Sequence, residues 1–268
     1  MFSINIKRLF KDLEALGKIG WVDGKGLFRE SYSESYCNAR EFVRQRMEET
    51  GLETRVDSVG NLFGKLEGSN YNTIMSGSHL DAVPGGGILD GALGVIGALE
   101  AVRSIKEHDV KLKHSVEVVG FIGEEGGPLG GTFGSRAFSG QITALPPPEV
   151  LSAVNLTSKD IELARGNLNS YDAFIELHIE QGPILWRKGI PIGIPTAIVG
   201  IHRYICNVLG VANHAGTTPM EDRKDALHEA ISIIYKWLNC MKSLNNIVYN
   251  NIGYFNVKPG HPSIVPGE

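Results

Sequence analysis

Three short segments of the sequence place acidic residues and histidine beside glycine, and these residue types together can bind a divalent metal. They contain His79, Asp81 and Asp90 in the first segment, Glu124 and Glu125 in the second, and His178 in the third. Imidazole and carboxylate groups suit Zn²⁺ or a related borderline ion, and a pair of ions needs a bridging carboxylate. The sequence therefore predicts a metal site, with Asp90 as a candidate bridge.

Two further features support this chemistry. A metal-bound histidine needs an acceptor for its second ring nitrogen, and Asp81, two residues after His79, can supply one. In the pair Glu124-Glu125, one carboxylate can bind a metal while the other accepts a proton from water. Because adjacent residues of an extended strand point to opposite faces, the pair requires a turn there, which the flanking glycines permit.

Each signal alone has a simpler interpretation. A single histidine at a strand end is more often structural than a ligand, and a Glu-Glu pair is usually part of a solvated turn. The glycine run from Pro84 to Gly87 is typical of a loop, and it lacks the Gly-Lys-Ser/Thr ending of a phosphate-binding loop. The joint occurrence of the three segments favours the metal site.

The elements that must position these residues follow from hydrophobic periodicity. The patterns predict helices at 6–16, 39–47 and 91–107, and strands at 54–56, 61–66, 73–76, 115–122 and 174–179. The order strand, helix, strand predicts a parallel sheet, and ligands bind beyond the carboxyl ends of such strands. His79 and the Glu124-Glu125 pair both lie just past predicted strand ends.

The sequence changes character after Gly200. Strands predicted at 203–211 and 247–257 flank a long amphipathic helix predicted over 222–241. We therefore expect two domains, 1–200 and 201–268. The expected fold class is α/β: a mixed, largely parallel sheet flanked by helices, followed by a smaller, incomplete α+β domain.

Composition narrows the classes of protein. The chain has 268 residues, 42% of them hydrophobic and 21% charged, which excludes a disordered protein. A net charge of -4 argues against nucleic-acid binding, and no apolar run approaches the roughly 20 residues of a membrane span. The three cysteines show no CxxC spacing, so we expect a cytoplasmic protein.

Six motifs together resemble one known family. They are Ser76 to Pro84, Asp90 to Val95, Glu124 to Gly126, Gly134 to Arg136, Leu177 to Pro183 and His214 to Met220. From about Arg40 to the last residue, the chain resembles the amidase/hydantoinase-carbamoylase branch of the di-zinc peptidase-like amidohydrolases. This branch includes N-carbamoyl-L-amino-acid hydrolases, allantoate amidohydrolases and β-ureidopropionases.

The resemblance implies a role for each candidate residue and two divalent ions, Zn²⁺ or else Mn²⁺, Co²⁺ or Ni²⁺. His79 and His178 bind one metal, Glu125 binds the other, and Asp90 bridges both. Glu124 is the general base, Asp81 is counted with it as catalytic through its support of His79, and Gln181 and His214 contact the substrate. His214 belongs to the smaller domain, which in the family forms a lid and a homodimer interface. The implied reaction is hydrolysis of a linear C–N bond in a carbamoyl or ureido compound.

The chain also departs from the family pattern. The family continues for roughly another third of its length, which carries the last His ligand of the second metal and an Arg that binds the substrate carboxylate. Ser263 stands where the family usually has Asn. We therefore expect a weakened second metal site. Two alternatives stay open: a truncated, inactive remnant or metal-binding module, and a dipeptidase or aminoacylase of the same superfamily.

Overall fold

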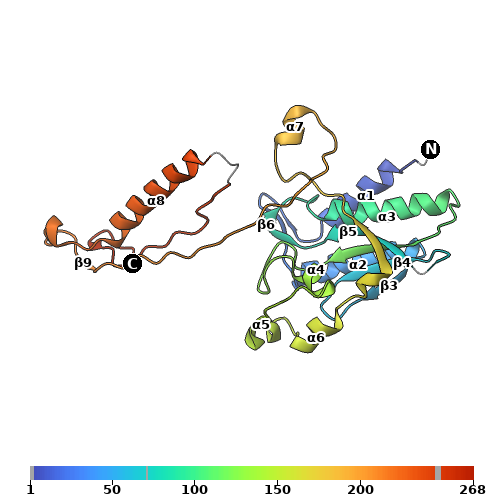
Figure 1. The fold of residues 1–268 in the computed structure, drawn as a ribbon, viewed down its shortest axis with the longest axis horizontal. Helices are drawn as coiled ribbons and strands as arrows, with labels where there is room; N and C mark the ends of the chain where they lie inside the picture. Colours follow the sequence, from blue (N-terminus) through green and yellow to red (C-terminus); the bar gives the residue numbers. More distant parts are fainter. Residues whose placement is uncertain (1–2, 71, 245–248) are drawn as a thin grey trace. The chain divides into compact units, whose positions relative to one another are not determined.

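The computed structural model describes residues 3–70, 72–244 and 249–268, which divide into two compact units. Unit 1 is Met1–Gly193 and unit 2 is Ile194–Glu268. The division falls before the expected boundary near Gly200. Figure 1 follows the chain through both units.

Unit 1 is built on a mixed five-stranded sheet. Its order is β3 (Glu53–Val56), β4 (Leu62–Leu66), β7 (Ser115–Phe121), β5 (Thr73–His79) and β8 (Tyr171–Ile175). The pairs β3–β4 and β4–β7 are antiparallel, whereas β5 lies parallel to both β7 and β8. The α/β class and the mixed sheet are confirmed. The last strand begins earlier than the predicted 174–179 and ends at Ile175, before the histidine.

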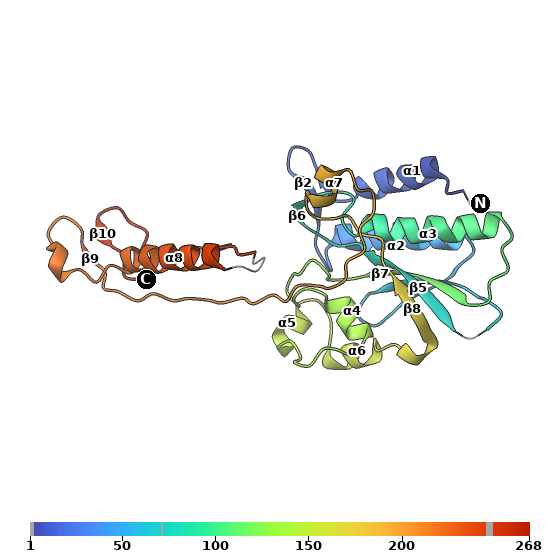
Figure 2. The same cartoon turned by 45° about the horizontal axis from the view of Figure 1, so that its top comes forward.

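Alternating side chains of this sheet face two separate cores. Leu62 and Val118 belong to the larger core, whereas their neighbours Phe63 and Val119 belong to the core on the opposite face. The larger core is covered by α1 (Ile6–Gly17), α2 (Glu34–Glu49) and α3 (Ala92–Glu107). The short helices α4 (Phe133–Phe138), α5 (Pro148–Ser152) and α6 (Ser158–Leu163) lie on the other face (Figure 2). This arrangement follows because successive side chains of a strand point to opposite faces of the sheet.

The three long helices agree with the predicted ones, and capping explains where two of them start. The Asn5 side chain accepts a hydrogen bond from the amide of Arg8 at the start of α1. Ser33 does the same for the amide of Tyr36, so α2 begins before the predicted residue 39. Side-chain acceptors at this position satisfy amides that have no partner inside the helix.

A second sheet of unit 1 consists of β1 (Trp21–Val22), β2 (Gly26–Arg29) and β6 (Ala82–Gly86), all antiparallel. In this sheet Arg29 pairs with Ala82, directly after the segment from His79 to Asp81. Two short helices complete the unit: the 3₁₀ helix η1 (Leu168–Ser170) and α7 (Ile184–Lys188). The chain therefore runs from the end of β5 almost directly into this small sheet.

Unit 2 contains β9 (Asn213–His214) paired antiparallel with β10 (Ile264–Val265), the 3₁₀ helix η2 (Met220–Asp222) and α8 (Ala226–Ser243). The long helix is confirmed, although it starts at Ala226, where Asp225 caps it. The strand predicted at 203–211 is wrong, because these residues pair with no described strand and Ile205 is 94% exposed. Of the strand predicted at 247–257, residues 247–248 lie outside the described residues and 249–257 form no strand.

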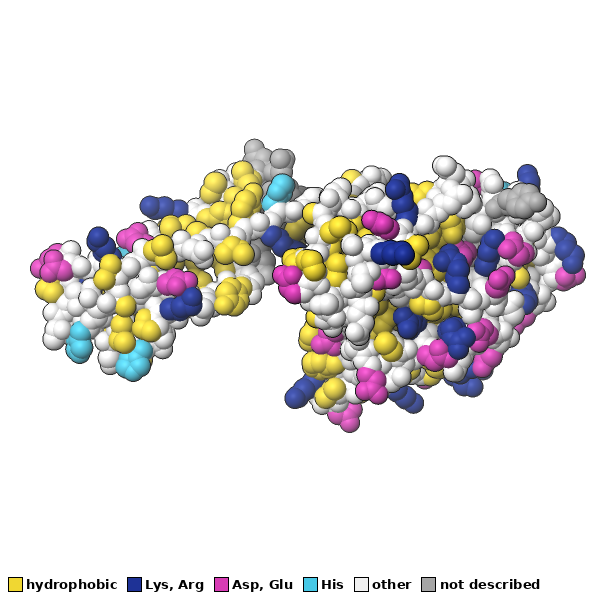
Figure 3. All heavy atoms as spheres, turned by 90° about the horizontal axis from the view of Figure 1, so that it is seen from below, with side chains coloured by type: hydrophobic (Ala, Val, Ile, Leu, Met, Phe, Trp, Pro, Cys, Tyr) yellow, Lys and Arg dark blue, Asp and Glu magenta, His cyan; other side chains and the backbone are white. Residues whose placement is uncertain are grey.

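Hydrophobic side chains are exposed at several places on unit 2 (Figure 3). Those most exposed include Ile194, Ile198, Val199, Ile201, Tyr204, Ile205, Leu209 and Tyr235. Among the described helices of the whole chain, none combines the length and the apolar character needed to cross a membrane.

Candidate metal centre

The three predicted segments meet at one edge of the main sheet. His79 ends β5, Glu124 and Glu125 follow β7, and His178 follows β8. Because β5 is parallel to both neighbours, the carboxyl ends of these three strands lie at the same edge. Asp90 joins them from the segment that leads into α3.

The ligand atoms of three residues converge closely. The Nε2 atoms of His79 and His178 lie 3.4 Å apart, and Asp90 Oδ1 lies 3.8 Å from the first and 3.3 Å from the second. One ligand atom from each of the three residues lies within 4.8 Å of the others. Glu125 Oε1 is 3.6 Å from His79 Nε2. The structure therefore brings together all four residues expected to bind metal.

The hydrogen bonds of the two histidines show that this arrangement fits a cation. His79 Nδ1 lies 3.0 Å from the carbonyl oxygen of Asp81, and His178 Nδ1 lies 2.9 Å from that of Ile179. Since a carbonyl only accepts, each Nδ1 donates to it, which leaves Nε2 of each ring facing the cluster as the nitrogen that can bind a metal. Two ring nitrogens and a carboxylate facing one point match the ligands that a borderline divalent ion prefers.

Asp81 has a different set of partners from the expected one. It does supply the acceptor for His79, but through its backbone carbonyl, since its nearer carboxylate oxygen lies 3.8 Å from Nδ1. The buried carboxylate instead accepts from three successive amides, those of Gly123 and Glu124 on Oδ1 and that of Glu125 on Oδ2, at 3.0, 3.2 and 3.0 Å. Asp81 thereby ties the end of β5 to the turn after β7.

The turn after β7 lets the two adjacent glutamates take different partners. Gly123 and Gly126 have positive φ angles, which the reversal after β7 needs. Glu124 accepts two hydrogen bonds at 3.0 Å from the amide and hydroxyl of Ser135. Burial raises its pKa, and the Ser135 hydrogen bonds oppose that shift. Burial also raises the pKa of Glu125, against the attraction of His79.

Two glycines at the start of α3, one before its first residue and one within it, allow the candidate metal ligands to approach, a feature that the sequence patterns did not reveal. A Cβ on Gly91 would lie 2.4 Å from His79 Nδ1, and one on Gly94 would lie 2.4 Å from the carbonyl oxygen of Leu177. Gly91 is the residue before α3 and Gly94 lies in its first turn, and together they leave room for β5 and the segment before His178. Their shared spacing and lack of side chains were the available signal.

Gln181 and Glu180 lie beside the cluster and have separate partners. Gln181, with φ at +51°, donates from Nε2 to both carboxylate oxygens of Asp90 at 2.9 and 3.1 Å. Glu180 accepts hydrogen bonds from the amides of Ile184 and Leu185 at 2.6 and 2.8 Å, so it caps α7. The expected contact of Gln181 with substrate stays a prediction.

His214 lies in unit 2, where β9 pairs it with Ile264. Its Nδ1 accepts a hydrogen bond of 3.1 Å from the amide of Gly216. The loop after it is held by Arg223, which donates to the carbonyl oxygens of Ala215 and Thr218. Sequence reasoning missed Arg223. The expected contribution of His214 to catalysis stays a prediction.

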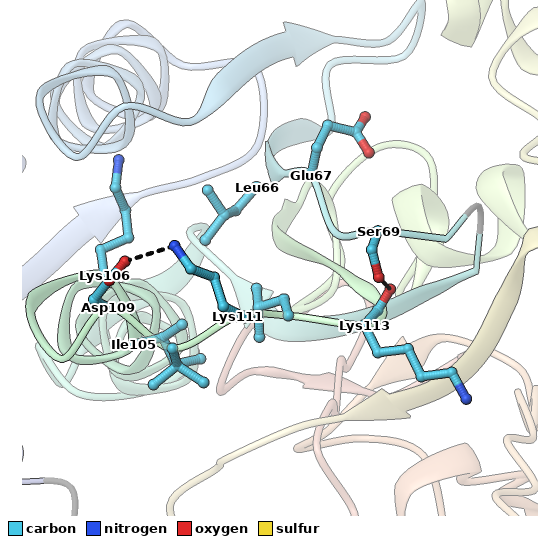
Figure 4. A pocket seen from close by; sticks show the side chains of 10 residues that line it. Leu66, Glu67, Ser69, Ile105, Lys106, Asp109, Lys111 and Lys113 are labelled. Carbon is cyan, nitrogen blue, oxygen red and sulfur yellow. Dashed lines mark hydrogen bonds and ion pairs between the residues drawn. The ribbon is translucent and has the colours of Figure 1, made fainter.

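A hollow at the opposite end of the strands carries a different set of side chains (Figure 4). It is lined by residues that precede β5 and β7, among them Glu67, Ser69, Lys106, Lys111 and Lys113. Lys111 pairs with Asp109 at 3.0 Å, and Lys106 donates to the carbonyl of Thr50. The charges in this hollow are thus largely paired within the chain, unlike the converging acceptors at the carboxyl ends.

The mixed sheet and the His-Asp-His cluster at its carboxyl ends are similar to those of metallopeptidase-like proteins, and comparison with known proteins agrees. Residues 61–156 match Peptidase family M28. An N-carbamoyl-L-amino acid amidohydrolase of Geobacillus stearothermophilus is 35% identical over 97% of this chain and 66% of its own length. An allantoate amidohydrolase of Bacillus subtilis (strain 168) is 34% identical over 99% of this chain and 68% of its own length.

Solved structures point to the same family. A hydantoinase/carbamoylase family amidase from Burkholderia ambifaria superposes with a TM-score of 0.74 at 28% identity, covering 99% of this chain and 67% of that one. The chain belongs to this hydantoinase/carbamoylase family of amidases, and it spans about two thirds of the length of the relatives it matches.

Proposed function

We propose that this chain is the metal-binding part of an amidohydrolase that cleaves a linear C–N bond of a carbamoyl or ureido compound. The observation that carries the proposal is the convergence of His79 Nε2, His178 Nε2 and Asp90 Oδ1, with two glutamates held beside them. The names of the relatives suggest the substrate class: N-carbamoyl-L-amino acids, allantoate and, for a rice protein 32% identical, ureidoglycolate. All three compounds contain a ureido group.

The proposed mechanism assigns His79, His178 and Asp90 to one divalent ion, and Asp90 and Glu125 to a second, weaker site. Such ions, when bound, polarise the scissile carbonyl and lower the pKa of water. Glu124 then accepts a proton from water and delivers it to the leaving nitrogen. Its raised pKa suits this exchange, and its hydrogen bonds to Ser135 keep the carboxylate in one orientation.

Substrate binding is proposed for residues outside the ligand set. The side-chain amide of Gln181 points towards the metal centre, because it donates a hydrogen bond to Asp90. His214 supplies positive or hydrogen-bonding character where charge develops on the carbonyl oxygen. The exposed apolar side chains of unit 2 support association into a homodimer through that unit.

The test is an assay of the purified chain loaded with Zn²⁺ or Mn²⁺. We expect release of ammonia from N-carbamoyl-L-amino acids, allantoate or ureidoglycolate, and none of the activity on dipeptides that the peptidase match would suggest. The matched control is Glu124→Gln, which should bind metal normally yet lose roughly 10²- to 10⁴-fold in rate.

Two results would contradict the proposal. Cleavage of dipeptides in preference to carbamoyl compounds would place the protein with the peptidases. Normal metal binding with no ammonia from any ureido substrate would mean that this chain is an inactive metal-binding module.

A further inference from the structure

Arg29, on β2, places a fully buried guanidinium behind the metal centre. Its relative exposure is 0%. Nε donates to the carbonyl oxygen of Leu80 at 2.7 Å, and Nη1 donates to that of Leu16 at 2.9 Å. Leu80 stands between His79 and Asp81, whereas Leu16 lies in the last turn of α1. One side chain thus joins the end of an outer helix to the segment that carries a metal ligand.

The surroundings accommodate part of the buried charge: Nη1 also donates to the carbonyl oxygen of Ile19 at 3.4 Å, whereas Nη2 is buried without a hydrogen-bond partner among the described residues. The last carbonyls of a helix lack partners within it and carry partial negative charge, which the guanidinium of Arg29 meets at Leu16. Burial lowers the pKa of Arg29 to about 10, and the negative charge of Asp81 opposes that shift. Arg29 is therefore a cation at neutral pH. Its planar fork can reach two carbonyls on different elements at once, which a lysine ammonium cannot match.

The contacts of Arg29 lead directly to the ligands. The peptide between Leu80 and Asp81 is held on one side by the Arg29 hydrogen bond. Beyond it, the Asp81 carbonyl accepts from His79 Nδ1, and the Asp81 carboxylate holds the amides of the turn that carries Glu124 and Glu125. A shift of this peptide would move the ring of His79 and that turn together.

We infer that Arg29 is a positioning residue of the metal centre, which holds the His79–Asp81 segment against the end of α1 so that the ligands keep their geometry. This inference rests on the proposed function, because it assumes that the His79 cluster binds metal. Removing the hydrogen-bonded support of a metal ligand weakens metal binding about ten- to hundredfold in other proteins. We expect a loss of this size on replacement of Arg29.

The test compares Arg29→Lys with Arg103→Lys. Arg103 is a matched control because it is also buried and also contacts α1, through Asp12 at 2.6 Å, but its other partners, Glu100 and Thr50, belong to no metal-binding segment. Zn²⁺ affinity is measured by competition with a chromophoric chelator, and ligand geometry by the visible absorption of bound Co²⁺. Arg29→Lys should bind Zn²⁺ at least tenfold more weakly and change the Co²⁺ spectrum, whereas Arg103→Lys should lower only the thermal stability.

Wild-type Zn²⁺ affinity and an unchanged Co²⁺ spectrum in folded Arg29→Lys would overturn the inference and leave the proposed function intact. Absence of metal binding by the wild-type chain would instead refute the proposed function. Should Arg29→Lys not fold, the wild-type protein supplies a second measurement, because the buried Nε–H groups of Arg29 and Arg103 give separate NMR signals. Zn²⁺ should shift the Arg29 signal and leave that of Arg103 in place; an unmoved Arg29 signal contradicts the inference.

Discussion

Replacement of Gly91 by alanine would change the metal centre through a single methyl group. Gly91 has φ at +63°, and a Cβ there would lie 2.4 Å from Nδ1 and 2.5 Å from Cε1 of His79. Ordinary van der Waals contacts of a Cβ begin near 3.4 Å. The imidazole, or the segment before α3, must therefore move by about 1 Å to admit the methyl group.

Burial and a hydrogen bond restrain the side chain of His79 against this movement. The residue is only 4% exposed, and its Nδ1 is bonded to the Asp81 carbonyl. A zinc–nitrogen bond is about 2.0–2.1 Å long, so a displacement of about 1 Å is half a bond length. We expect Zn²⁺ affinity to fall at least tenfold, or about 1.4 kcal/mol, in addition to about 1–2 kcal/mol of folding stability lost to the left-handed backbone.

The assay pairs Zn²⁺ titration with urea unfolding, and Gly189→Ala is the control. Gly189 has the same φ of +63°, but a Cβ there meets nothing within 4 Å. Both variants should lose stability, with the larger loss in Gly91→Ala because its methyl group also meets His79, and only Gly91→Ala should lose metal affinity. Equal Zn²⁺ affinity in the two variants would refute the argument that Gly91 is required for the position of His79.

Three further outcomes test other parts of the site. Asn61→Ala should reduce the free energy of unfolding, measured in urea, by about 1–3 kcal/mol. The reason is that buried Asn61 accepts a hydrogen bond of 3.0 Å from the amide of Ile122, which alanine leaves without this acceptor. A change below about 0.5 kcal/mol would contradict this expectation. Gly94→Ala should lower the melting temperature more than Gly87→Ala. A Cβ at Gly94 meets the backbone of Leu177, whereas a Cβ at Gly87 meets nothing within 4 Å. Equal melting temperatures would be inconsistent with close packing of α3 on the segment that contains Leu177. Zn²⁺ at a hundredfold excess over its Kd should raise the free energy of unfolding by about 2.7 kcal/mol, and a chelator should reverse this increase. The His178→Ala variant should show little of the increase. Full stabilisation of that variant by Zn²⁺ would exclude His178 as a ligand.

Local patterns predicted much of unit 1 and the end of the sheet at which the candidate residues meet. The strand ending at His79 and the strand before Glu124 could be read from short apolar runs, because a buried strand needs nearly continuous apolar residues. Parallel pairing then brings their carboxyl ends together. In unit 2 the same reasoning failed at 203–211, because an apolar run forms a strand only where a partner strand accepts its hydrogen bonds.

Residue types and their spacing are enough to identify the groups available for chemistry: the two imidazoles, the aspartates and the adjacent glutamates, each near glycines that permit sharp turns. The contacts that hold these groups in place arise from the folded chain. The carboxylate of Asp81 accepts from amides more than forty positions along the chain, Arg29 joins α1 to Leu80, and Gly91 makes room for the ring of His79. Such contacts join residues that are distant in sequence, and their partners are backbone groups that every residue carries, so no pattern of side chains can identify them.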